Sequence, residues 1–225
     1  MDIYTELPEF TGRCRLFPLP NVVLFPHVIL PLHIFEPRYR QMTQDALDGD
    51  QLVTIVQIRP DVAGSPRVEP APIMDVACLG KIVQHERLAD GRFNMLLLGC
   101  KRIRLDREVT TTKLYRIAEG TVLEDDAPDA PDESRRNELI ERFFEALQVG
   151  GKVDPDLSTL LHSDLPMGIL SDVIAHALDL PGAVKQSLLE EPRVECRITT
   201  LLSILQSLAT RVPRWRRFPP PFSSN

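Results

Sequence analysis

Few of the reactive residues in this sequence stand at the spacings that catalysis requires. Gly150-Gly151-Lys152-Val153 is the nearest approach to a phosphate-binding loop, but it lacks the hydroxyl side chain that would hold a magnesium ion. No serine lies in a G-x-S-x-G turn. Neither H-E-x-x-H nor H-x3-H occurs among the five histidines, which are His27, His33, His85, His162 and His176. The sequence therefore predicts no catalytic residue, no cofactor and no metal site. A non-enzymatic protein is expected, and a small hydrolase is kept as an alternative.

Two basic clusters could contact the phosphates of a nucleic acid. The first is Lys101-Arg102-Ile103-Arg104 together with Arg107, and the second surrounds Trp215 with Arg211, Arg214, Arg216 and Arg217. Guanidinium groups beside an aromatic ring suit single-stranded nucleic acid. Phosphate binding depends on cation density, however, and this chain has a net charge of −6 and a pI of about 5.4. A nucleic-acid partner is therefore disfavoured, and RNA binding is an alternative.

The four cysteines and the start of the chain indicate a cellular setting. The cysteines form no C-x-x-C pair, and each lies in or beside an apolar run, as expected of small buried side chains in a reducing compartment; they are Cys14, Cys78, Cys100 and Cys196. The opening MDIYTELPEF has no basic segment followed by an apolar core, so it does not resemble a secretory signal. No apolar run approaches the roughly 20 residues that cross a bilayer. We expect a cytoplasmic protein without a membrane partner.

The first half of the chain predicts a sheet with one helix. Prolines interrupt the apolar runs between Arg15 and Phe35, so these runs suit short strands or extended segments. A helix is expected after Glu36-Pro37, and a buried strand over residues 52–58. Asp90-Gly91 predicts a tight hairpin turn with positive φ at both residues. Gly99 marks a bulge in the second arm, and residues 114–123 supply a further strand.

The second half predicts helices. Residues 124–133 (EDDAPDAPDE) are acidic and contain proline, as linkers do. Apolar stripes at helical spacing then predict four helices, around residues 139–147, 169–178, 183–189 and 198–209. The predicted organisation is a β-rich domain over residues 1–123, a linker over 124–133, a helical bundle over 134–212 and a flexible tail over 213–225. This is an α+β protein.

One segment resembles a known family. Residues 16–47, LFPLPNVVLFPHVILPLHIFEPRYRQMTQDAL, closely resemble the opening of the amino-terminal, substrate-binding domain of Lon proteases. The arm LLLGCKRIRL (residues 96–105) and the helical half also fit, so the resemblance covers residues 13–210. It implies a PUA-like pseudo-barrel followed by an α-helical bundle, in a free-standing form without the ATPase and Ser–Lys peptidase domains that continue a Lon protease.

The resemblance also implies a function, namely non-catalytic recognition of proteins or peptides with a link to protein quality control. The partner would be an unfolded or extended segment or a folded protein, and a homodimer is left open. The candidate binding residues are Phe25, His27, Phe35, Glu36 and Tyr39, because aromatic side chains dominate binding hot spots. The alternative is that each phenylalanine or tyrosine belongs to the core, where such residues usually lie.

Overall fold

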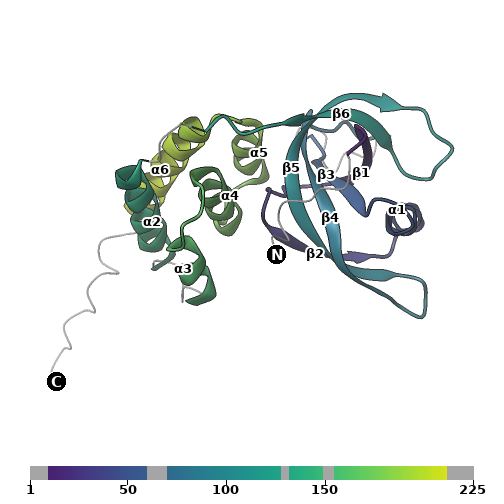
Figure 1. The fold of residues 1–225 in the computed structure, drawn as a ribbon, viewed down its shortest axis with the longest axis horizontal. Coiled ribbons are helices and arrows are strands. Elements are labelled where there is room, and N and C mark those ends of the chain that lie inside the picture. The colour runs from purple at the N-terminus through teal and green to yellow at the C-terminus, as the bar shows by residue number, and fades with distance from the viewer. Residues whose placement is uncertain (1–9, 60–69, 128–131, 149–154, 212–225) are drawn as a thin grey trace, which may run out of the picture. The chain divides into compact units, whose positions relative to one another are not determined.

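The structure is a computed structural model, and it describes residues 10–59, 70–127, 132–148 and 155–211 (Figure 1). These ranges contain six strands and six helices, so the predicted α+β class is confirmed. The strands are β1 (Arg13–Leu19), β2 (Ile29–Ile34), β3 (Leu52–Gln57), β4 (Val76–Arg87), β5 (Phe93–Val109) and β6 (Ile117–Leu123). The helices are α1 (Pro37–Leu47), α2 (Glu133–Gln148), α3 (Pro155–Leu161), α4 (Met167–Ala177), α5 (Gly182–Glu190) and α6 (Val194–Arg211).

The chain forms two compact units. The first contains residues Met1–Asp126 and Asp172–Pro192, and the second contains Ala127–Ser171 and Arg193–Asn225. The sheet, α1, α5 and the last part of α4 therefore belong to the first unit. The domain boundaries predicted from composition describe parts of the chain that fold independently. The two compact units do not test independent folding, so those boundaries remain a prediction.

The six strands form one sheet in the order β2-β5-β4-β3-β1-β6 (Figure 1). β6 pairs with β5 as well as β1, so the pairings lead from β5 through β4, β3, β1 and β6 back to β5. β1 and β3 are parallel, and the other pairs are antiparallel. β2 lies outside this circuit and, among the described strands, pairs with β5 alone.

The core of the first unit explains why β3 forms. The strand predicted over residues 52–58 is β3, Leu52–Gln57, and every residue of it is buried, as expected for a continuous run of apolar and β-branched side chains. Its neighbours in the core include Leu16 of β1 and Leu79 of β4. The helix predicted after Glu36-Pro37 is α1, which buries one face formed by Tyr39, Met42, Thr43 and Ala46.

The predicted hairpin at Asp90-Gly91 joins β4 to β5, but its turn differs from the expectation. Only Gly91 of this pair has a positive φ, of 80°. Gly91 donates its N–H to the carbonyl of Leu88, and Leu88 donates to the carbonyl of Arg92, each at 2.9 Å. These bonds define a longer loop, in which an ordinary turn is followed by one glycine in the left-handed region. One residue with positive φ therefore suffices.

The predicted bulge at Gly99 is confirmed. Gly80 pairs with Gly99 while Leu79 pairs with Lys101, so Cys100 is the extra residue. A side chain at Gly99 would collide with the backbone carbonyl of Phe25. Gly99 therefore permits the segment that precedes β2 to lie directly against β5.

In the second unit α2 and α6 pack against each other. Leu139 and Phe143 of α2 are buried, as are Leu201 and Leu205 of α6. Arg135 of α2 also pairs with Glu195 of α6, with 2.6 Å between the nitrogen and the oxygen. The four predicted helices are present, but α3 was not expected. It has only seven residues, too few to display a repeating apolar stripe.

Candidate protein-binding surface

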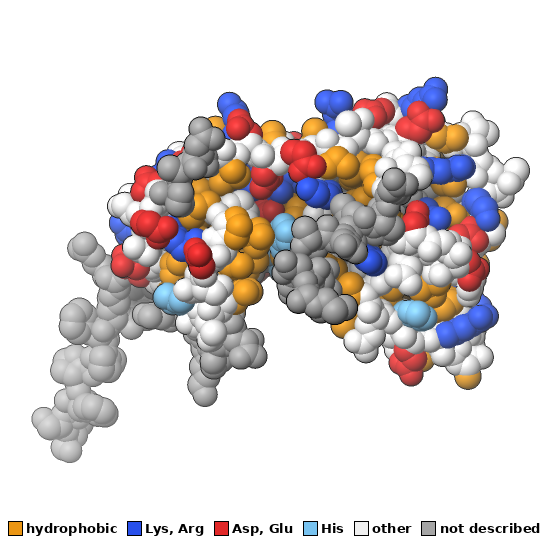
Figure 2. All heavy atoms as spheres, in the orientation of Figure 1, with side chains coloured by type: hydrophobic (Ala, Val, Ile, Leu, Met, Phe, Trp, Pro, Cys, Tyr) orange, Lys and Arg blue, Asp and Glu red, His pale blue; other side chains and the backbone are white. Residues whose placement is uncertain are grey.

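Exposed apolar side chains gather where β2, β5 and β4 lie side by side. The described residues include five large hydrophobic side chains that are exposed, and three of them lie here: Ile29 (50%), Phe35 (61%) and Val83 (42%). Ile29, Pro31 and His33 alternate along β2, so they share one face of the sheet and Phe35 follows them. We call Ile29, Pro31, His33, Phe35, Val83 and Leu96 the β2 face. Figure 2 shows hydrophobic side chains and a histidine over the β4–β5 hairpin.

A shallow groove of about 430 Å³ runs across this region. Its lining comes from Pro31–His33 of β2, Gln84–Glu86 of β4 and Asn94–Leu96 of β5. The strand register explains the grouping, because Pro31 pairs with Leu96 and Leu96 pairs with Gln84. Four apolar residues and five polar or charged residues therefore share one concave surface.

Hydrogen bonds hold the polar end of the groove. Nδ1 of His33 lies 2.7 Å from Oδ1 of Asn94, and Nδ2 of Asn94 donates to Glu86 at 3.3 Å. The other ring nitrogen of His33 lies 3.4 Å from a guanidinium nitrogen of Arg92. An acceptor faces Nδ1 and a donor faces Nε2, so this arrangement suits the tautomer that carries its hydrogen on Nδ1. The ring also stacks on Phe35, with 6.3 Å between the ring centroids.

The five predicted binding residues lie in different environments. Phe35 is exposed and belongs to the β2 face. Glu36 stands just before α1, where it makes no side-chain cap and instead pairs with Arg38 at 2.8 Å. These two residues can be reached from solvent, and their role in binding stays a prediction.

Phe25 and Tyr39, by contrast, are core residues. Phe25 has no exposed surface, and Tyr39 is 6% exposed. Tyr39 packs on Phe17 with 4.3 Å between ring centroids, and the guanidinium of Arg38 covers its ring at 4.6 Å. Burial raises the pKa of the Tyr39 hydroxyl. The structure thus places these two predicted anchors inside the fold, in agreement with the alternative that assigned them to the core.

His27 has a backbone role. It adopts a φ of 63°, which is uncommon for a residue other than glycine, and its N–H donates to the carbonyl of Gly99 at 2.8 Å. The ring is half-buried, and this burial lowers the pKa of His27 although the charge of Asp172 acts in the opposite direction. His27 therefore fixes the segment that leads into β2.

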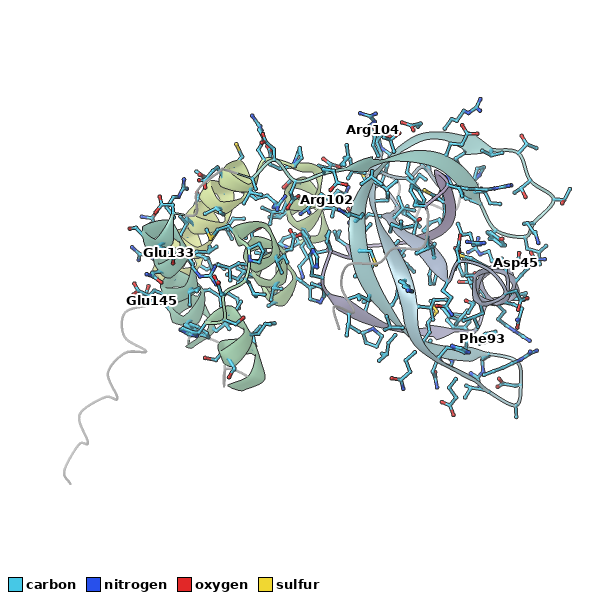
Figure 3. The ribbon with its side chains drawn as sticks, viewed as in Figure 1. Asp45, Phe93, Arg102, Arg104, Glu133 and Glu145 are labelled. Atoms are coloured by element: carbon cyan, nitrogen blue, oxygen red, sulfur yellow. The ribbon has the colours of Figure 1, made fainter. Side chains whose placement is uncertain are left out.

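The basic cluster at Lys101–Arg107 consists of one buried arginine and three solvent-accessible cations that are paired with carboxylates. Arg102 is 2% exposed, and it donates to both carboxylate oxygens of Asp172, at 3.0 and 2.5 Å, and to Asp125 at 3.0 Å. Arg102 and Arg104 leave the same stretch of β5 (Figure 3). The other cations pair with carboxylates, Lys101 with Glu124, Arg104 with Asp106 and Arg107 with Glu119. Paired cations leave little net charge for phosphates. The side chains of the cluster around Trp215 lie outside the described residues.

Burial also makes the thiols of Cys14, Cys78 and Cys100 poor nucleophiles. Cys14 and Cys78 are buried, as predicted, whereas Cys100 and Cys196 are only half-buried. Burial raises the pKa of Cys14 to about 11 and also raises the pKa values of Cys78 and Cys100. In the described ranges, no three His, Cys, Asp or Glu side chains gather as metal ligands would. Within the same ranges, no helix has the length and hydropathy to span a membrane.

Comparison with known proteins identifies the family. The model of the ATP-dependent protease La (LON) substrate-binding domain matches residues 13–207. The chain belongs to the LON substrate-binding domain family. The resemblance found in residues 16–47 is thereby confirmed across most of the chain.

Individual relatives agree with this membership. Lon protease 2 of Syntrophobacter fumaroxidans is 27% identical over 193 residues, which cover 85% of this chain and 24% of that protein. Lon protease of Escherichia coli is 27% identical over 203 residues, which cover 89% of this chain and 26% of that protein. The chain thus spans about a quarter of the length of these relatives.

Two solved structures share the fold. The crystal structure of a Lon N-terminal domain protein from Xanthomonas campestris has a TM-score of 0.61 and 21% identity, and covers 85% of this chain and 97% of its own. The N-terminal domain of the Mycobacterium avium complex Lon protease has a TM-score of 0.65 and 17% identity, and covers 89% of this chain and 100% of its own.

Sequence reasoning missed Ile29 and Val83 as exposed apolar residues. A weak signal for Ile29 was present, because Pro31 and His33, which share its parity along the strand, are less apolar than Leu30, Leu32 and Ile34. Val83 gave no such signal, since its exposure follows from an irregularity in the pairing of β4 with β5 between Ile82 and Gln84.

Proposed function

We propose that this LON-family chain recognises unfolded or extended segments of other proteins through the β2 face. The observation that carries the proposal is the exposure of Ile29, Phe35 and Val83, three large apolar side chains whose neighbours along β2 and β4 line one groove. Monomeric soluble proteins seldom leave apolar side chains clustered without a reason, and such clusters mark interaction sites. The family description, a substrate-binding domain, supports the same function.

The proposal extends to what the chain does with a bound client. Binding is non-catalytic, and the chain serves protein quality control by holding clients in the cytoplasm. A homodimer is compatible with this function, although the β2 face is proposed for clients. Phe35 is the anchor, because aromatic side chains contribute disproportionately to binding and its ring is largely free of the core.

A matched pair of variants tests the proposal. Phe35→Ser removes an exposed aromatic from the β2 face, and Leu114→Ser removes an equally exposed side chain (63%) from a loop before β6. The probe is fluorescein-labelled lactalbumin, reduced and carboxymethylated so that it stays unfolded, and binding is followed by fluorescence anisotropy. Phe35→Ser is expected to weaken binding about tenfold, the effect of losing a hot-spot side chain. Leu114→Ser is expected to bind as the parent does.

The contrary results are equally defined. Equal affinities for Phe35→Ser and the parent would reject the β2 face as the client site. A loss with Leu114→Ser but not with Phe35→Ser would move the site to the loop before β6. Thermal unfolding of both variants should match that of the parent, because neither side chain is buried.

A further inference from the structure

The first hydrogen bonds of β2 determine which backbone groups face β5. Gly99 donates its N–H to the carbonyl of Val28 at 2.8 Å, and the register then continues along β2 without a shift. Bonded and non-bonded positions alternate in an antiparallel pair. Leu30, Leu32 and Ile34 are therefore the positions whose backbone groups bond β5. The N–H and C=O groups that point away from β5 belong to Ile29, Pro31 and His33.

Pro31 fits this assignment. Proline has no N–H, so within a sheet it is tolerated where that group would face away from the neighbouring strand. In the described part of the chain, β2 is the last strand in the sheet order, and no backbone hydrogen bond outside the sheet reaches Ile29, Pro31 or His33. The outer edge of β2 thus offers two N–H donors, from Ile29 and His33, and three carbonyl acceptors.

The edge strand itself contains no acidic residue, lysine or arginine, although the guanidinium of Arg92 lies beside His33. From Pro26 to Phe35 the chain has no Lys, Arg, Asp or Glu, and burial lowers the pKa of His27. Natural edge strands usually carry charged side chains, which prevent another strand from pairing with them. An apolar edge strand without such side chains complements an apolar segment without charge, because neither strand must bury an ion.

We infer that β2 binds an extended, uncharged and largely apolar segment of a client as a seventh strand. This inference rests on the proposed function and specifies how the client is held. Backbone hydrogen bonds to Ile29 and His33 supply affinity for any sequence, and side chains of the client pack beside Ile29, Pro31 and Phe35. Pro31 lacks an N–H, so an added strand gains one hydrogen bond fewer at that position.

The matched variants are His33→Pro and His33→Ala. Both lose the imidazole and its contact with Asn94, but only proline also removes the outward N–H. The unfolded lactalbumin probe is used again with the full chain. His33→Pro is expected to bind about fivefold more weakly than His33→Ala, the effect of one hydrogen bond worth about 1 kcal/mol. Equal affinity of the two variants, with equal thermal unfolding, would overturn strand addition.

Hydrogen exchange provides a second measurement that does not depend on how His33→Pro folds. In the parent chain, the amides of Ile29 and His33 are expected to exchange at least tenfold more slowly when the probe is bound, because they become hydrogen-bonded. Unchanged exchange at both amides during saturated binding would exclude strand addition. If Phe35→Ser has weakened binding, unchanged exchange rejects only strand addition. Recognition of clients through the β2 face then still stands. Protection in the absence of probe that increases with protein concentration would instead assign the edge to a second copy of the chain and contradict the inference.

Discussion

On β2 itself no exposed side chain is an acid, a lysine or an arginine, whereas on the segments where β5 pairs with β6 charged side chains form ion pairs. Arg107 of β5 pairs with Glu119 of β6, and Arg116, the residue before β6, pairs with Glu108 of β5. β6 also has neighbours on both sides, while β2 has one in the described sheet. One sheet therefore has two kinds of surface. Where β5 pairs with β6, charged groups are paired within the chain, whereas the outer edge of β2 has backbone groups with which another chain could form hydrogen bonds.

Buried and exposed arginines on β5 should respond very differently to substitution. Arg102→Ala leaves the carboxylate of Asp172, which is 1% exposed, without its bidentate partner. We expect a loss of about 3–5 kcal/mol in the free energy of unfolding, as found when one partner of a buried ion pair is removed. Urea denaturation measures this loss. Arg107→Ala is the control, and its unfolding midpoint should equal that of the parent; a small effect of Arg102→Ala would show that Asp172 is not held as described.

The segment that enters β2 should confer a pH dependence. Burial places the pKa of His27 below its ordinary value of 6.5, so the unfolded chain binds more protons than the folded chain in the window below pH 6.5. Stability is therefore fully present above pH 6.5 and falls as the pH decreases through that window. His176 acts in the same direction, because burial also lowers its pKa.

His27→Asn isolates the contribution of His27. Asparagine tolerates a positive φ, so the backbone conformation is retained while the titrating ring is lost. We expect the variant to lose less stability than the parent between pH 7.5 and pH 5.5, as measured by urea denaturation. An identical pH dependence in the two proteins would assign the effect to His176 or another group.

The smallest expected effect concerns the far side of the β2 face. Val83→Thr keeps the shape of an exposed β-branched residue but removes one methyl group from the apolar surface. Client affinity is expected to decrease about threefold, equivalent to roughly 0.6 kcal/mol, with unchanged thermal unfolding. Val122→Thr, on β6, provides a comparison away from the β2 face, and its affinity should match the parent. A larger loss for Val122→Thr would reverse the comparison between the two ends of the sheet.

Local patterns predicted much of the fold. Leu52–Gln57 forms a buried strand, Pro37 lies in the first turn of a helix, Asp90-Gly91 lies in a hairpin and Gly99 adjoins a bulge. Each depends on neighbours a few residues away, which the sequence displays directly. The helix α3 escaped prediction because seven residues cannot display a helical period.

The candidate site was harder to predict, because the sequence does not state which apolar residues remain outside. Phe25 and Phe35 stand ten residues apart in the same segment, yet one is fully buried and the other is 61% exposed. Their environments differ because the backbone of Phe25 lies against Gly99, 74 positions later in the chain, whereas Phe35 follows an edge strand. Proximity of this kind has no local signature.

The sequence by itself determined the family and the α+β class, since the run from Leu16 to Leu47 and the spacing of apolar residues are properties of the chain. Only the tertiary structure decided that Arg102 is a buried partner of Asp172, 70 residues away, and that β2 occupies the edge of the sheet. The physical reason is that hydropathy and turn preferences act over short separations. Burial and strand order depend on which distant segments meet.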